Sequence, residues 1–280
     1  MNAITIYDDV KNDLKLLTSS SIRTKIILSL NQDSKYLSDL KKEIGIGHST
    51  ILKEINKLET NDVVIKSNKK YLLSPIGKIN AVKLSNFFKS FCSVKNIQKM
   101  LLNHYINAIP SFLVDEIGCL DNSIILESSS SDIIKPFNYY TELISSSKRI
   151  KTVFPFFYYP YLNMYLDMFN QKKDVNLILT PLIIEKAVKT IGKDNLHQFN
   201  HLDYINLFKI KEDIKIALTV TDNFLSIGLF LDDGIYDATM ILINHEKEAI
   251  QWGDKLFNHF LKKSNKVSLN DLRYIKNNVF

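Results

Sequence analysis

The chain has 280 residues, of which 45% are hydrophobic and 24% charged, an ordinary globular composition that excludes a disordered or fibrous protein. The length suits two domains better than one, because most domains hold roughly 100–200 residues. No N-terminal basic patch with an apolar run marks a secretory signal, and no stretch approaches the roughly 20 apolar residues of a membrane-spanning helix. We therefore predict a cytoplasmic protein without a membrane partner.

The positive charge is concentrated in the first third of the chain. Residues 1–105 hold 17 lysines and arginines against nine acidic residues, a net charge of +8, whereas the remainder carries a net charge of −2. Such asymmetry is typical of a polyanion-binding module attached to another domain. A solvated lysine-rich surface would give the same count, so charge alone leaves both interpretations open.

The first sharply patterned elements are three helices. Apolar residues recur at helical spacing in Ser19–Asn31 and in Lys35–Ile44, and a third helix is predicted from His48 or Ser49 to Thr60. The turn Gly45-Ile46-Gly47 separates the second helix from the third. Two amphipathic helices joined by a short glycine-containing turn are typical of a helix-turn-helix.

A β-hairpin and a long helix follow. Val63–Lys66 and Lys70–Ser74 have the composition of strands, and Ser67-Asn68-Lys69 between them has that of a turn. Pro75 suits the first turn of a helix, and apolar residues continue at helical spacing to about Ile106. The order helix, helix, turn, helix, hairpin, long helix predicts a winged helix-turn-helix.

Beyond residue 108, apolar runs alternate with helical patterns. Strands are predicted at 123–127, 150–154, 175–180, 205–210, 214–221, 224–231 and 238–243, and helices at 137–147, within 161–171, at 182–190 and at 246–263. The fold class is therefore α/β (α+β): a winged helix-turn-helix followed by a larger mixed sheet, parallel in its first part and antiparallel towards the end. The predicted domains are the winged helix-turn-helix at 1–78, a linking or dimerisation helix at 79–107 and an α/β sensor or regulatory domain at 108–280.

The third helix and the hairpin carry the candidate DNA contacts. A helix fits the major groove, where hydroxyls, amides and cations can contact base edges or phosphates, and a basic wing can contact the backbone or minor groove. The free N–H groups at the start of a helix also favour a phosphate. The predicted DNA-binding residues are His48, Ser49, Thr50, Lys53, Asn56, Lys57, Lys66, Asn68, Lys69 and Lys70.

The chain resembles known archaeal regulators. The segments Ser49–Glu59 and Leu73–Lys78 resemble the winged-helix domains of ArsR/MarR-like archaeal regulators. Over its whole length the chain is similar to the FilR-type methanogenesis regulatory proteins, in the segments Ile109–Leu113, Ile117–Leu120, Leu179–Pro181, Leu225–Phe230 and Gly234–Asp237. The resemblance implies an archaeal, methanogen transcription regulator, dimeric, with a C-terminal domain that senses or assembles. It identifies no ligand.

The usual catalytic motifs do not occur in the sequence. G-x-S-x-G, the phosphate-binding P-loop, G-x-G-x-x-G and H-E-x-x-H are all absent. His245 and Lys247 begin a phospholipase D-like motif, but Trp252 stands where that motif needs an aspartate, Asp254 comes two residues late, and a second copy is absent. We therefore predict that the chain is not an enzyme.

The cysteines and histidines form no metal-binding pattern. Cys92 and Cys119 are too few for a disulfide framework and lack metal-ligand spacing, so we expect two buried, reduced thiols. His197 and His201 are four residues apart, as metal ligands on one helix face are, but no third ligand is obvious. The sequence therefore predicts neither a metal site nor a cofactor.

Aromatic residues follow the strand predicted at 150–154, and Thr180-Pro181 ends the strand predicted at 175–180. Small ligands of open α/β sheets gather at the carboxyl ends of strands. The candidate ligand-binding residues are Phe154, Tyr158, Tyr159, Tyr161 and Thr180, which combine hydroxyls with an apolar surface. Packing of the same aromatic residues against the final helix or a second subunit is the alternative, and the sequence leaves both open.

Together these patterns predict a sequence-specific transcription regulator that binds double-stranded DNA as a homodimer on an inverted repeat. The helix Lys78–Ile106, with Phe87, Phe88 and Phe91, is the candidate dimer interface. The C-terminal domain would sense an unknown small-molecule effector or mediate assembly. The alternative function is a winged-helix module that docks on other proteins and has no operator of its own.

Overall fold

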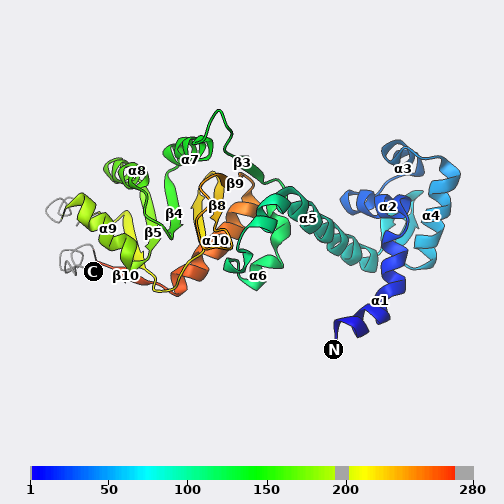
Figure 1. The fold of residues 1–280 in the computed structure, drawn as a ribbon. Helices are drawn as coiled ribbons and strands as arrows, with labels where there is room; N and C mark the ends of the chain where they lie inside the picture. Colours follow the sequence, from blue (N-terminus) through cyan, green and yellow to red (C-terminus); the bar gives the residue numbers. More distant parts are fainter. Residues whose placement is uncertain (1, 193–201, 269–280) are drawn as a thin grey trace. The chain divides into compact units, whose positions relative to one another are not determined.

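The computed structural model describes residues 2–192 and 202–268 and divides the chain into two compact units, residues 1–88 and 89–280 (Figure 1). The first unit contains α1 (Ala3–Thr18), α2 (Ser21–Gln32), α3 (Leu37–Ile44), α4 (His48–Thr60), the hairpin β1 (Val64–Ser67) and β2 (Lys70–Leu73), and the start of α5 (Pro75–Asn103). This order of α2, α3, α4, hairpin and long helix is the predicted winged helix. The three-domain boundaries set out above stay a prediction.

The first unit closes one small core because each of its helices has a single apolar face. Ile26 and Ile27 of α2, Leu40 of α3 and Ile51 and Ile55 of α4 are completely buried in it. Gly45 ends α3 in the left-handed conformation, at φ +75°, which allows the chain to turn at once into α4. The spacing of the apolar residues thus fixes which face of each helix points outward.

The wing is a tight antiparallel hairpin. Its register pairs Ser67 with Lys70, so that only Asn68 and Lys69 form the loop. Both loop residues have positive φ, +51° and +65°, as a type I′ turn requires. The turn therefore presents an amide and an ammonium group at its tip.

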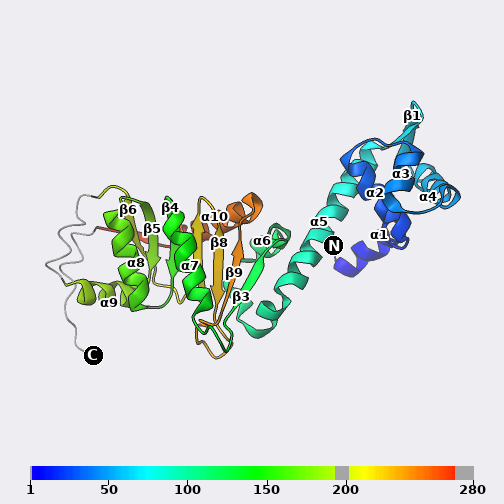
Figure 2. The same cartoon turned by 90° about the horizontal axis from the view of Figure 1, so that it is seen from above.

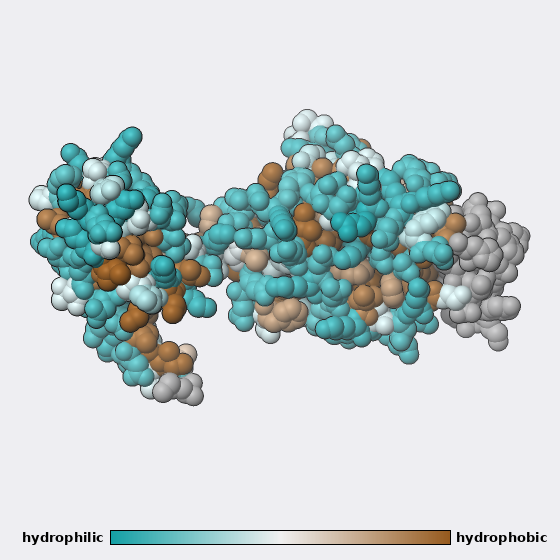
Figure 3. Space-filling view, turned by 180° about the vertical axis from the view of Figure 1, so that it is seen from behind, coloured by the Kyte–Doolittle hydropathy of each residue, from teal (hydrophilic) through white to brown (hydrophobic). Residues whose placement is uncertain are grey.

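Helix α1 was not among the predicted elements. Its residues repeat at helical spacing, but only Leu17 is buried, so the helix adds little to the core of its own unit. Figure 3 shows apolar side chains exposed along it. Such an amphipathic pattern predicts that the apolar face packs against another surface. Within the described part of the first unit, most of the apolar side chains of α1 remain exposed.

The second unit is built on one eight-stranded sheet. Its strands are β3 (Ile124–Glu127), β4 (Arg149–Phe154), β5 (Asp174–Leu179), β6 (Ile205–Lys209), β7 (Ile216–Thr221), β8 (Leu225–Leu229), β9 (Met240–Asn244) and β10 (Asn265–Val267). They lie in the order β10-β6-β5-β4-β7-β8-β9-β3. Its helices are the end of α5, α6 (Ser111–Val114), α7 (Lys135–Ser146), α8 (Tyr159–Asn170), α9 (Pro181–Ile191) and α10 (Lys247–Lys262), with 3-10 turns at Ile106–Ala108 and Ile117–Leu120.

The mixed sheet confirms the predicted fold class. Strands β4, β5 and β6 are parallel, and β7, β8 and β9 continue antiparallel from β4. Two details differ from the prediction. The early strand β3 pairs antiparallel with β9 at one edge, and the unpredicted β10 pairs antiparallel with β6 at the other. Both are edge pairings between segments far apart in sequence, which local patterns do not reveal.

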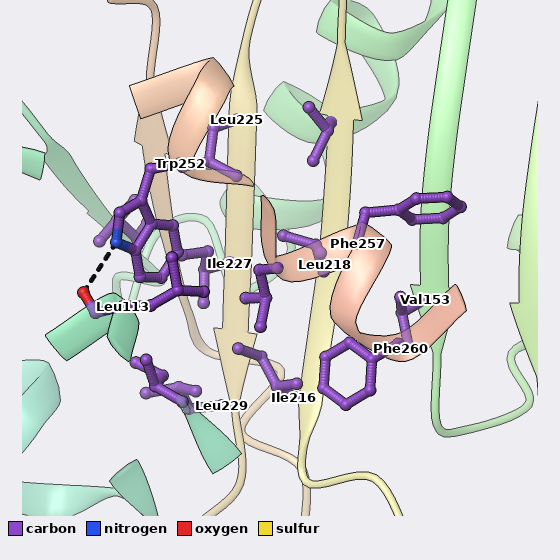
Figure 4. Packing of buried hydrophobic residues seen from close by; sticks show 14 of the residues in the cluster. Leu113, Val153, Ile216, Leu218, Leu225, Ile227, Leu229, Trp252, Phe257 and Phe260 are labelled. Atoms are coloured by element: carbon purple, nitrogen blue, oxygen red, sulfur yellow. Dashed lines mark hydrogen bonds between the residues drawn. The ribbon is translucent and has the colours of Figure 1, made fainter. Parts of the chain in front are cut away.

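One face of the sheet packs against α10 and α6. Trp252, Phe257 and Phe260 of α10 lie over Leu218, Leu225 and Ile227 of the central strands (Figure 4). The Trp252 indole is fully buried and donates a hydrogen bond of 3.0 Å to the Leu113 carbonyl oxygen. Burial of the large indole therefore leaves no polar group unpaired.

The other face is covered by α7, α8 and α9 (Figure 2). Thr152 of β4 and Thr219 of β7 are paired across the strands and hydrogen-bond Tyr165 of α8 at 2.8 Å and Tyr140 of α7 at 2.9 Å, respectively. Burial raises the pKa of the Tyr140 hydroxyl well above its usual value. These four buried hydroxyls attach two helices to the centre of the sheet through directional bonds.

The expectation about the cysteines can be compared with the structure, whereas that about the histidine pair cannot. Cys92 is exposed and Cys119 half-buried, so the expectation of two buried thiols was wrong, because Cys92 falls on an outward face of α5. His197 and His201 lie outside the described residues. Within residues 2–192 and 202–268, no helix is long and apolar enough to cross a membrane.

Gly77 tests the packing of the wing against α5. A Cβ atom there would lie 2.0 Å from the Val63 carbonyl oxygen, a backbone atom that already accepts the Ser74 N–H. We expect Gly77→Ala to destabilise the chain by roughly 1–3 kcal/mol in denaturant unfolding. Gly47→Ala, where a Cβ would meet nothing within 4 Å, is the control and should cost clearly less. Equal stability of Gly77→Ala and the parent chain would contradict this packing.

Candidate nucleic-acid interface

Helix α4 presents one polar, cationic face to solvent. Ile51, Ile55 and Leu58 are buried against α2 and α3, which fixes the rotation of the helix about its axis. The predicted DNA contacts in α4 are all exposed on its remaining surface: His48, Ser49, Thr50, Lys53, Asn56 and Lys57. One helix therefore brings together hydroxyl, amide, imidazole and ammonium groups on a single outward surface.

A buried ion pair holds α4 against α2. The Arg23 guanidinium of α2 lies 3.2 Å from the Glu54 carboxylate, and the two side chains are only 10% and 11% exposed. Arg23 also donates to the Ser19 hydroxyl at 2.8 Å. A charge pair with so little solvent resists changes in helix orientation, because moving either partner would leave a buried charge alone.

Glu54 also pairs with Lys57, one of the residues predicted to contact DNA. The Lys57 ammonium donates to its other carboxylate oxygen at 2.9 Å, while the lysine side chain stays 45% exposed. Burial opposes ionisation of Glu54, but the hydrogen bond and charge of Lys57 and the charge of Arg23 outweigh it and lower the pKa. Lys57 is thus held along the helix, whereas Lys53 has no ion-pair partner among the described residues.

The sequence interpretation missed this pair, although a signal was present. Glu54 is three residues after Ile51 and four before Leu58, so it shares their buried helix face. An acid on a buried face needs a cation, and Arg23 is the one arginine in residues 1–105.

The start of α4 is open to solvent. Gly47 is its N-cap residue and contributes no side-chain hydrogen bond to the first turn. His48, Ser49 and Thr50 in that turn are exposed. The first backbone N–H groups therefore have no side-chain cap from Gly47, which is the arrangement that favours an anion.

The cations of the wing differ in freedom. The Lys66 ammonium lies 5.2 Å from the centre of the Tyr71 ring, and that of Lys70 lies 5.1 Å from the Tyr36 ring. Lys66 is thereby held along the hairpin and Lys70 against the N-cap residue of α3. Lys69 and Asn68 at the tip are exposed. The wing thus presents Lys69 exposed at its tip and two cations positioned by aromatic rings, on the same unit as α4.

The candidate ligand residues surround an apolar cavity in the second unit. The cavity has a volume of about 110 Å³ and lies between α8 and α9 over β5. Phe154, Tyr158 and Tyr161 line it, together with aromatic and aliphatic side chains of both helices. Tyr159 is largely exposed at the first position of α8, and Thr180 is the N-cap residue of α9; neither lines the cavity. The structure thus brings three of the five together.

The phospholipase D-like residues make separate contacts. The His245 ring is hydrogen-bonded to the Asn223 carbonyl oxygen, and Asp254 pairs with Lys151 at 2.6 Å. Trp252, at the position of the motif's aspartate, is buried on the sheet. Among the residues that the structure describes, no group of three or more histidine, cysteine or acidic side chains has the arrangement of a metal site.

Two domains of one regulatory family match this chain. Residues 11–91 match the N-terminal domain of the methanogenesis regulatory protein FilR1, and residues 133–263 match its middle domain. The chain belongs to the FilR1 family. FilR1 of Methanothrix harundinacea (strain 6Ac) is 25% identical over 268 residues, which cover 94% of this chain and 60% of that protein. The chain thus spans about three-fifths of the length of its curated FilR1 relative.

Solved structures resemble the fold only distantly. The archaeal chromatin protein TrmBL2, whose structure is described as showing a novel mode of DNA binding, covers 95% of this chain at 9% identity, with a TM-score of 0.40. The phospholipase D family member Nuc from Salmonella typhimurium covers 52% of this chain and 97% of its own, at 10% identity and a TM-score of 0.37. The FilR1 assignment therefore stands on the two domain matches.

The Arg23–Glu54 pair generates a pH-dependent prediction. Glu54 has a lowered pKa in the folded chain, so its contribution to stability is present above the ordinary glutamate pKa of 4.5 and is lost as pH falls through the lower folded value. We expect Glu54→Gln to destabilise the chain by about 2–3 kcal/mol at pH 7, since it leaves Arg23 buried without its counterion.

The measurement is urea unfolding of both chains between pH 7 and pH 3, in which the difference should shrink towards the acid end. Glu59→Gln, on the same helix and without an ion pair among the described residues, is the matched control. A difference that stays constant across this range would argue against ionised Glu54 as its source.

Proposed function

We propose that this chain is a transcription regulator that binds double-stranded DNA sequence-specifically, with α4 as the recognition helix and the β1–β2 hairpin as a wing. The observation that carries the proposal is the single exposed face of α4, on which Ser49, Thr50, Lys53 and Asn56 lie together. Membership of a regulatory family supports it.

The chemistry of that face suits base edges. Lysine can donate to guanine, asparagine can bond adenine through two hydrogen bonds, and serine or threonine can contact several bases. Lys53 and Asn56 are three residues apart and so lie on one side of the helix. Protein interfaces are depleted of lysine, which gives DNA the preference over the interaction-module alternative.

We propose that the first turn of α4 and the wing contact the DNA phosphates. The uncapped first turn of α4 offers backbone donors, and Lys66, Lys69 and Lys70 supply positive charge on the hairpin. The net charge of +8 over residues 1–105 agrees with a polyanionic partner. Catalysis is no part of the proposal, because the sequence lacks the usual catalytic motifs.

We further propose that the regulator acts as a homodimer. Ile4, Tyr7 and Leu14 of α1 are exposed at turn spacing, between 43% and 69%. Ile76, Ile79 and Val82 of α5 are also exposed, as are the predicted interface residues Phe87, Phe88 and Phe91. Apolar surface on two helices of a DNA-binding unit fits a second copy, because paired units can bind two half-sites.

Substitutions in α4 and the wing test DNA binding directly. We expect Lys53→Ala to weaken binding about tenfold or more, and Lys57→Ala to weaken it less, because Lys57 is shared with Glu54. The double substitution Lys69→Ala/Lys70→Ala should reduce the slope of log affinity against log salt by up to about 2. Fluorescence anisotropy over a salt series measures both quantities. Lys189→Ala, in the second unit, removes one positive charge, as Lys53→Ala does, and should change neither quantity. An unaltered slope in the double variant would remove the wing from the interface.

Substitutions in α1 test the dimer. We expect the molar mass of the native chain, measured by light scattering at micromolar concentration, to be about twice that of one 32.3 kDa chain. A buried, unpaired carboxylate is costly, so Tyr7→Glu/Leu14→Glu should give a monomer. Asn12→Glu, exposed on the opposite side of α1, should leave the dimer intact. A native chain that is monomeric in this experiment would refute the dimer.

A further inference from the structure

The cavity between α8 and α9 is a second feature that calls for an occupant. Its walls are successive turns of the two helices, Tyr161 and Tyr165 from α8 and Ile184 and Val188 from α9, and its floor includes Leu177 of β5. The α8 wall extends from Tyr161 to Phe169, two helical turns or roughly 12 Å. The space is therefore elongated along the helices.

Water is a poor occupant of this space. A cavity lined by aliphatic and aromatic side chains offers water too few hydrogen bonds. An apolar small molecule would bury more apolar surface there.

The lining also restricts the charge of the occupant. None of the described residues that line the cavity is a lysine, arginine, histidine, aspartate or glutamate. A carboxylate, phosphate or ammonium group inside would be buried without a counterion. Polar groups come from tyrosines: the Tyr165 hydroxyl is bonded to Thr152 at 2.8 Å, whereas that of Tyr161 has no hydrogen-bond partner among the described residues.

The end of the cavity that Tyr158 and Tyr161 line lies where such a sheet usually binds a ligand. Phe154 and Leu179, which line the cavity, are the last residues of the parallel strands β4 and β5. Ligands of such sheets bind outside the carboxyl ends of the strands. Tyr158 and Tyr161 lie at this end, so the polar part of a ligand would lie there and its apolar part between the helices.

We infer that this cavity binds a neutral, elongated and largely apolar small molecule, an alkyl chain with an uncharged hydroxyl or carbonyl group that bonds Tyr161. The inference goes beyond DNA binding by giving the second unit a ligand class. Its use in regulation rests on the proposed function, but binding itself does not, and it is measured without DNA.

The test is calorimetric titration of the full chain with 1-decanol and with decanoate at pH 8, two probes that differ in the charge of the head. We expect 1-decanol to bind at least tenfold more tightly than decanoate. Ala187→Phe places a ring in the cavity from its smallest lining residue and should weaken 1-decanol binding at least tenfold. Leu182→Phe, on the same helix but exposed and outside the cavity, should bind like the parent.

Thermal unfolding of each variant separates ligand loss from misfolding, because Ala187→Phe should keep or raise Tm by filling the void. Tyr161→Phe, which keeps the ring, should weaken 1-decanol but not decane. No binding of 1-decanol to the parent, equal binding of decanoate, or full binding by a folded Ala187→Phe chain would each overturn the inference. A chain that binds 1-decanol but no DNA would refute the proposed function alone.

Discussion

A carboxylate buried in the middle of α4 has to be matched by a cation, and Arg23 of α2 supplies it at 3.2 Å. Together with Ile51, Ile55 and Leu58, this pair fixes the rotation of α4 and hence the side chains that remain outward. Lys57 donates to the same carboxylate. Lys53 has no ion-pair partner among the described residues and is therefore the more available of the two lysines for a DNA contact.

In the second unit, both faces of the sheet are apolar and both are covered by helices. Trp252 and its neighbours on α10 pack tightly on one face. On the other, hydroxyl bonds from Thr152 and Thr219 fix α7 and α8, while α8 and α9 leave a cavity between them.

Much of this arrangement could be predicted from local patterns. Amphipathic spacing located α2 to α5 and nearly every strand, and the order of elements predicted the winged helix and the mixed sheet. The pairing of β3 with β9, the strand β10 and the partner of Glu54 could not be predicted that way, since each depends on residues distant in sequence. Tyr158 and Tyr159 are adjacent and identical, yet only Tyr158, the extended N-cap residue before α8, lines the cavity. The residue at which α8 begins decides this, and local patterns do not fix helix ends to a single residue.

The central claim is that the exposed face of α4 distinguishes one DNA sequence from another. Binding of the chain to DNA fragments from upstream of its own gene, at physiological salt and against a large excess of unrelated DNA, tests it most directly. We predict that at least one fragment stays bound when the competitor is in excess, and that Lys53→Ala removes this preference while weak general binding persists. If excess unrelated DNA displaces the chain from every fragment, sequence-specific recognition by α4 is contradicted.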